Sequence, residues 1–88
     1  MDRSARRTQR AAPVSLDKAP SEQAVRVLAV DGDREGARLL GQLQIRVGAV
    51  LRVQRAAPLG GPLLVECGGS TVIISRRLAR RVQVEVLA

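Results

Sequence analysis

The stretch DGDREG, residues 31–36, has the spacing of acidic residues that comes closest to a metal site. Acids occupy its first, third and fifth positions and glycine its sixth, as in a calcium-binding EF-hand loop. The twelfth position is Gln42 instead of a bidentate glutamate, and the preceding residues are strand-like instead of helical. We therefore predict that these acids begin a short helix, with Asp33 as its N-cap and Glu35 near the positive end of the helix dipole.

Cys67 is the single cysteine of a chain that contains no histidine. Neither a disulfide within the chain nor a zinc site of cysteines and histidines can therefore form. The apolar, strand-like surroundings of Cys67 favour a buried thiol that packs like a small hydrophobic residue. The alternative interpretation is a lone thiolate ligand in a weak association with Fe(II). We expect no cofactor and no dedicated metal site.

The chain offers no pair of groups suited to acid–base catalysis. Histidine is absent, and the carboxylates of Glu66 and Glu85 are expected at surface positions of strands. We therefore predict that the protein is not an enzyme.

The loop AAPLGGPLLV, residues 56–65, combines glycine and proline in a way that raises the question of a phosphate site. A phosphate-binding loop needs converging backbone N–H groups, usually at the start of a helix. Pro58 and Pro62 each remove such a donor, and the residues that follow predict a strand. Gly60 and Gly61 can supply the positive φ angles of a turn. We predict a shaped turn between two strands.

Four arginines close together form the densest basic cluster of a chain whose formal net charge is +7; they are Arg76, Arg77, Arg80 and Arg81. A spacing of four residues places them in pairs on one side of a helical turn. We favour a solvated surface, and the alternative is contact with RNA phosphates, anionic lipid or an acidic protein. Because the chain has no aromatic residue, bases cannot stack on aromatic side chains, so specific nucleic-acid binding is not expected.

Hydrophobic periodicity divides the chain into a tail and one small domain. Residues 1–18 are polar and arginine-rich, so we predict a disordered basic tail before a domain at 19–88. Strand-like runs lie at 23–31, 49–55, 62–67, 70–75 and 82–86, with a helical stripe within 31–45 and a helical turn within 75–81. About five short strands predict an all-β barrel, with a short helix after the first strand and a helical turn before the last.

The longest uncharged run, 56–65, has ten residues and is broken by glycine and proline, so it cannot span a bilayer. The basic N-terminus lacks the apolar core of a signal peptide. We expect a cytoplasmic protein that is at most peripheral to a membrane.

Three segments within 16–87 resemble the pattern of the FeoA family, the small cytoplasmic component of bacterial ferrous iron uptake. They are the helical segment with its following turn, the loop APLGGP, and the final hairpin with the last strand. The matching positions are Leu40, Leu43, Ile45, Gly48, Ala57, Pro58, Leu59, Gly60, Pro62, Gly69, Ala79, Val82 and Val84. Two departures bear on the surface: Gln44 replaces a family glycine at the helix end, and Gly61 replaces a family aspartate.

The resemblance implies a small SH3-like barrel that supports a FeoB-type iron transporter, which carries a cytoplasmic GTP-binding domain. Because barrels of this class bind through their loops, we expect partner contacts at the helix stripe and at the proline–glycine loop. The predicted contact residues are Leu39, Leu43, Ile45, Pro58, Leu59, Gly60, Gly61 and Pro62. The alternative, from the charge of the chain, is a basic SH3-like adaptor that binds RNA or another protein.

Overall fold

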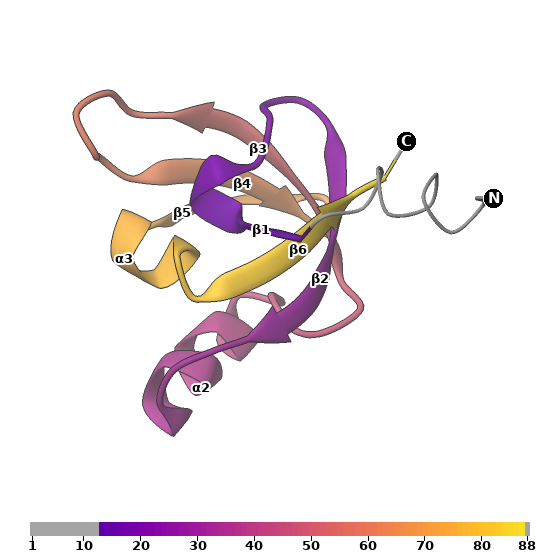
Figure 1. Ribbon diagram of the computed structural model, residues 1–88, viewed down its shortest axis with the longest axis vertical. Helices are drawn as coiled ribbons and strands as arrows, with labels where there is room; N and C mark the ends of the chain where they lie inside the picture. The colour runs from indigo at the N-terminus through magenta and orange to yellow at the C-terminus, as the bar shows by residue number, and fades with distance from the viewer. Residues whose placement is uncertain (1–12, 88) are drawn as a thin grey trace, which may run out of the picture.

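The computed structural model describes residues 13–87 as one antiparallel sheet of six strands with short helices between them. The elements are β1 (Val14–Ser15), η1 (Leu16–Lys18), β2 (Ala24–Val30), α2 (Arg34–Gln42), β3 (Val50–Ala56), β4 (Leu63–Cys67), β5 (Ser70–Ile74), α3 (Arg76–Ala79) and β6 (Val82–Val86). The strand order is β1-β6-β2-β3-β4-β5, and the sheet curls around one core (Figure 1). The predicted all-β barrel and both predicted helical segments are confirmed.

The core is built from aliphatic side chains and one cysteine. Alternation along each strand sends every second residue inward, as Leu51 and Val53 of β3 illustrate. The buried residues are Leu16, Val25, Val27, Leu40, Ile45, Leu51, Val53, Leu63, Val65, Cys67, Ile74, Ala79, Val82 and Val84. Among residues 13–87 no polar or charged residue is buried as a whole, although the Asp17 side chain is only 7% exposed, so burial of apolar surface is the main source of stability.

The first strand and the 3₁₀ helix correct the prediction of a disordered tail that reaches residue 18. Val14 pairs with Val84 of β6, and Leu16 of η1 is completely buried. The Asp17 carboxylate faces the Arg80 guanidinium at 3.9 Å. The apolar pair Val14 and Leu16, embedded in polar sequence, is enough to attach this segment to the barrel. The rest of the predicted tail, residues 1–12, lies outside the described residues.

The helix α2 begins where the acidic stretch predicts. The Asp33 carboxylate accepts a hydrogen bond from the backbone N–H of Gly36 at 2.9 Å, which is the N-cap interaction. Leu40 anchors the helix in the core, and α2 ends at Gln42. The acids of residues 31–36 therefore shape a helix start, in agreement with the sequence.

The second half of the barrel also follows the predicted order. Strands β4 and β5 form a hairpin whose two turn residues, Gly68 and Gly69, both have positive φ. Ser75 caps α3, because its hydroxyl accepts a hydrogen bond from the N–H of Leu78. Within residues 13–87 no helix is long and apolar enough to cross a membrane.

Candidate functional site

Titratable side chains in the described part of the chain do not gather into a cluster of metal ligands. No group of three or more His, Cys, Asp or Glu side chains lies close enough to hold an ion. Cys67 is 5% exposed, and its thiol donates to the carbonyl oxygen of Gln44 at 3.2 Å. Burial raises the pKa of this thiol, although the nearby Arg46 charge lowers it in part. The neutral thiol packs as the sequence predicts.

The loop between β3 and β4 is closed by its own backbone. The N–H of Ala57 donates to the carbonyl of Pro62 at 2.9 Å, and the N–H of Gly61 donates to the carbonyl of Pro58 at 3.2 Å. At the tip, Leu59 has a φ of +61° and its side chain is 102% exposed. A loop with two internal hydrogen bonds presents this leucine directly to solvent.

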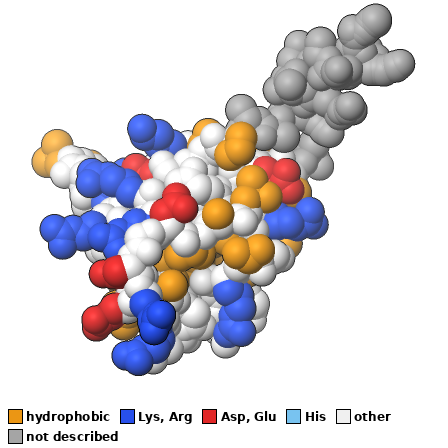
Figure 2. Space-filling view, turned by 60° about the horizontal axis from the view of Figure 1, so that its bottom comes forward, with side chains coloured by type: hydrophobic (Ala, Val, Ile, Leu, Met, Phe, Trp, Pro, Cys, Tyr) orange, Lys and Arg blue, Asp and Glu red, His pale blue; other side chains and the backbone are white. Residues whose placement is uncertain are grey.

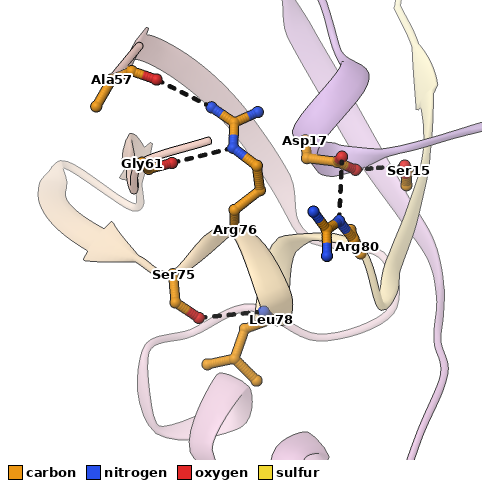
Figure 3. Close-up of polar contacts among 8 residues, drawn as sticks. All are labelled: Ser15, Asp17, Ala57, Gly61, Ser75, Arg76, Leu78 and Arg80. Atoms are coloured by element: carbon orange, nitrogen blue, oxygen red, sulfur yellow. Dashed lines mark hydrogen bonds and ion pairs between the residues drawn. The ribbon is translucent and has the colours of Figure 1, made fainter. Parts of the chain in front are cut away.

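Arg76 holds the same loop from the side of α3. Its Nε donates to the carbonyl of Gly61 at 3.0 Å, and its Nη2 donates to the carbonyl of Ala57 at 3.1 Å (Figure 3). The capped turn of α3 places Arg76 directly after Ser75, so the guanidinium extends toward the loop (Figure 3). Arg76 therefore serves the shape of the loop.

The other three arginines of the predicted basic cluster also differ in their surroundings. Arg80 faces Asp17, as Figure 3 shows, and Arg81 contacts the Asp33 carboxylate at 3.3 Å. Arg77 is exposed, and no hydrogen bond or ion pair joins its side chain to another residue of 13–87. Three of the four side chains thus reach three different partners, and the cluster does not form one uniform basic surface.

The predicted contact residues of the helix stripe separate into exposed and buried ones. Leu39 is 46% exposed and Leu43 is partly buried, whereas Ile45 is 1% exposed and belongs to the core. The reason is the turn after α2: Gln44 has a φ of +70°, and the N–H of Ile45 donates to the carbonyl of Leu40 at 2.9 Å. This bond directs Ile45 inward, which corrects its prediction as an exposed contact.

One further apolar surface was not predicted. Arg55, Leu64 and Ile73 lie side by side on β3, β4 and β5, and they line a shallow groove of about 180 Å³ beside the proline–glycine loop. Alternation in STVII could have revealed Ile73, which is 69% exposed, because Val72 and Ile74 take the inner face. At the end that carries α2, hydrophobic side chains gather among basic and acidic ones (Figure 2).

The proline–glycine loop and its groove together form the candidate site. Pro62 and Ile73 line the groove, and Arg76 holds the loop. The other predicted loop residues, Pro58, Leu59, Gly60 and Gly61, belong to the part of the loop outside the groove. Most of these groups are apolar and exposed on a fixed backbone, an arrangement suited to binding a protein partner.

Comparison with known proteins gives a consistent result. A family model described as "FeoA domain" matches residues 14–86. A crystal structure of an iron uptake regulatory protein (FeoA) superposes with a TM-score of 0.79 at 25% identity, covering 86% of this chain and 99% of that one. The solution structure of the FeoA protein from Chlorobium tepidum gives a TM-score of 0.77 at 32% identity, covering 85% and 71%. None of the curated protein sequences compared matches the chain.

A different class of protein shares the architecture. A manganese-dependent transcriptional repressor in complex with manganese has a TM-score of 0.77 at 22% identity, over 88% of this chain and 37% of its own. At that identity the likeness concerns the fold alone. Together the superpositions confirm the predicted SH3-like barrel.

Proposed function

The chain belongs to the FeoA domain family, and from this premise we propose that it is a non-catalytic accessory protein of ferrous iron uptake. It acts in the cytoplasm, where it binds the cytoplasmic GTP-binding part of a FeoB-type transporter and modulates transport. The observation that carries the proposal is the family match, which extends over residues 14–86 of an 88-residue chain. Ferrous iron is the cargo of the transporter.

The surface chemistry supports a role in binding. The large apolar side chains of Leu59 and Ile73 are exposed to water, although the core of this small domain contains few large side chains. Exposed apolar groups beside a defined groove are typical of protein contact sites. Leu39 of α2 offers a second contact, since it is about half exposed on the helix surface.

Two measurements test this function. Deletion of the gene is expected to lower Fe(II) uptake, and the wild-type gene supplied in trans should restore it. The purified protein should also co-purify with the cytoplasmic part of the FeoB-type transporter of the same organism. Normal uptake in the deletion strain would contradict the proposed role.

The charge-based alternative, an adaptor for RNA, finds less support in the side-chain contacts. Arg76 donates to loop carbonyls, and Arg80 and Arg81 face carboxylates, so much of the basic cluster already has partners. RNA binding that disappears at physiological salt would amount to non-specific charge attraction. Binding that persists there would favour the adaptor.

A further inference from the structure

Leu59 combines two features that are unfavourable for an isolated protein. Its backbone occupies the left-handed region, where a side chain with a Cβ is disfavoured, and its side chain makes no use of the core. The next residue, Gly60, has a φ of +76° without such strain. Strained residues of this kind concentrate at functional sites, where the surrounding structure maintains them.

Four hydrogen bonds maintain the strained tip. Two are the backbone bonds that join Ala57 to Pro62 and Pro58 to Gly61, and two come from the guanidinium of Arg76. The base of the loop is also tightly packed, because a Cβ added to Gly61 would lie 2.8 Å from the Cβ of Ala57. The tip is therefore fixed before any partner arrives, which lowers the ordering cost of binding.

The neighbours of Leu59 define the shape that it presents. Pro58, Gly60, Gly61 and Pro62 carry small or compact side chains, so the leucine stands out as a single projection. A projection of this form matches a concave pocket. An anionic membrane would be better matched by a broad apolar surface with cations directed outward, whereas residues 57–62 carry one large apolar side chain and no cation.

We propose that Leu59 is the anchor of this protein, inserting its side chain into an apolar pocket of a folded protein partner, and that Arg76 is the residue that positions it. The inference rests on the proposed function, because the partner is taken to be the cytoplasmic part of the FeoB-type transporter. The groove lined by Leu64 and Ile73 adjoins the base of the same loop at Ala57 and Pro62, and it receives the rim of the partner's pocket.

The decisive variant is Leu59→Asn, because asparagine tolerates positive φ and has a similar size but a polar end. Its thermal stability should equal or exceed that of the wild type, while its Kd for the transporter's cytoplasmic part should rise at least about tenfold. Val47→Thr, which alters an apolar side chain that is exposed outside the loop, serves as the matched control and should leave the Kd unchanged.

A double-mutant cycle tests the positioning role of Arg76. Arg76→Lys should weaken binding several-fold in the wild-type background and have no further effect once Leu59→Asn is present. Arg77→Lys changes the neighbouring arginine, which has no contact with the loop, and should have no effect in either background. Equal losses in both backgrounds would contradict the positioning role.

The outcomes separate the anchor from the proposed function. If the wild-type protein binds the transporter's cytoplasmic part and Leu59→Asn binds equally well, Leu59 is not the anchor, and the proposed accessory function is still supported. If the wild-type protein does not bind, both fail. Binding of the wild type to vesicles that contain anionic phospholipid, lost in Leu59→Asn, would assign the leucine to a membrane and overturn the anchor.

Discussion

The turn after α2 and the loop between β3 and β4 both contain a residue with positive φ, but one directs an apolar side chain into the core and the other directs one into solvent. Each has a side-chain-bearing residue in the left-handed region, Gln44 in the first and Leu59 in the second. At the turn, the polar residue stays outside and the following Ile45 enters the core. In the loop, the left-handed residue is itself apolar and points into water.

The two left-handed residues are compensated by different interactions. The cost at Gln44 is offset within the chain by burial of Ile45 and by the bond from the Cys67 thiol to the Gln44 carbonyl. The strained backbone at Leu59 is held in place by the hydrogen bonds from Arg76. No burial of apolar surface offsets this strain, because the Leu59 side chain is exposed. The first region therefore serves folding, and the second serves an encounter with another molecule.

The largest change in stability is expected at the turn after α2, where Ile45 is directed into the core. Ile45→Ala should lower the free energy of unfolding by about 2–5 kcal/mol, because it removes buried methyl groups and leaves a cavity. Leu59→Ala, its counterpart in the outward region, should change stability by less than about 0.5 kcal/mol. Urea denaturation followed by circular dichroism gives both values. Similar losses in the two variants would erase the contrast between the regions.

A second prediction concerns the packed base of the outward loop. Gly61→Ala should destabilise the protein by about 1–3 kcal/mol, because the new Cβ lies 2.8 Å from the Cβ of Ala57. The aspartate of the FeoA pattern carries the same Cβ, so Gly61→Asp should not be neutral in this chain.

The matched control is a glycine in open space. Gly41 of α2 has no neighbouring atom within 4 Å of an added Cβ, so Gly41→Ala should stabilise the helix by roughly 0.5–1 kcal/mol. Chemical denaturation of both variants checks the pair. A tolerated Gly61→Ala would mean that the loop base has room to adjust.

A third prediction isolates the positive φ that the two regions share. Gln44→Gly restores the glycine of the family pattern and should raise stability by up to about 1 kcal/mol, since glycine adopts positive φ without steric cost. Leu59→Gly should give a similar gain in the melting temperature but lose partner binding. If Gln44→Gly also weakened binding, the two regions would not be functionally distinct.

The smallest effect comes from the thiol beneath the inward turn. Because burial raises the pKa of Cys67 in the folded state above its ordinary value of 9.0, the folded protein holds the proton more tightly than the unfolded chain. This contribution to stability is complete below pH 9 and decreases as the pH rises through the higher pKa of the folded state. The denaturation midpoint of Cys67→Ala should lie below that of the wild type by a constant amount up to about pH 9, because a buried side chain is lost, and the gap should narrow above pH 9.

Local patterns explain how much of the fold was predictable. Runs of apolar residues predicted the strand at 49–55, and short-range hydrogen-bonding rules predicted the N-cap at Asp33. These features depend on residues close in the sequence, so a single sequence contains the necessary information.

The candidate site was only partly predictable because its decisive contacts are long-range. Arg76 contacts residues 15 and 19 positions away, which no periodicity reveals. The inward direction of Ile45 depends on the positive φ of Gln44, and a glutamine in the sequence does not indicate a positive φ. Burial of Leu16 likewise depends on a strand partner near the opposite end of the chain.

The position of β6 between β1 and β2 has a consequence for the order of folding. Strand β6 pairs with both β1 and β2, so the sheet cannot be completed before residues 82–86 are in place. Pairings between distant segments slow folding, because the closure of long loops must precede the gain in contacts. A chain in which residues 82–86 have not yet paired thus leaves one edge of β1 and one edge of β2 without hydrogen-bonding partners, and the core lacks Val82 and Val84.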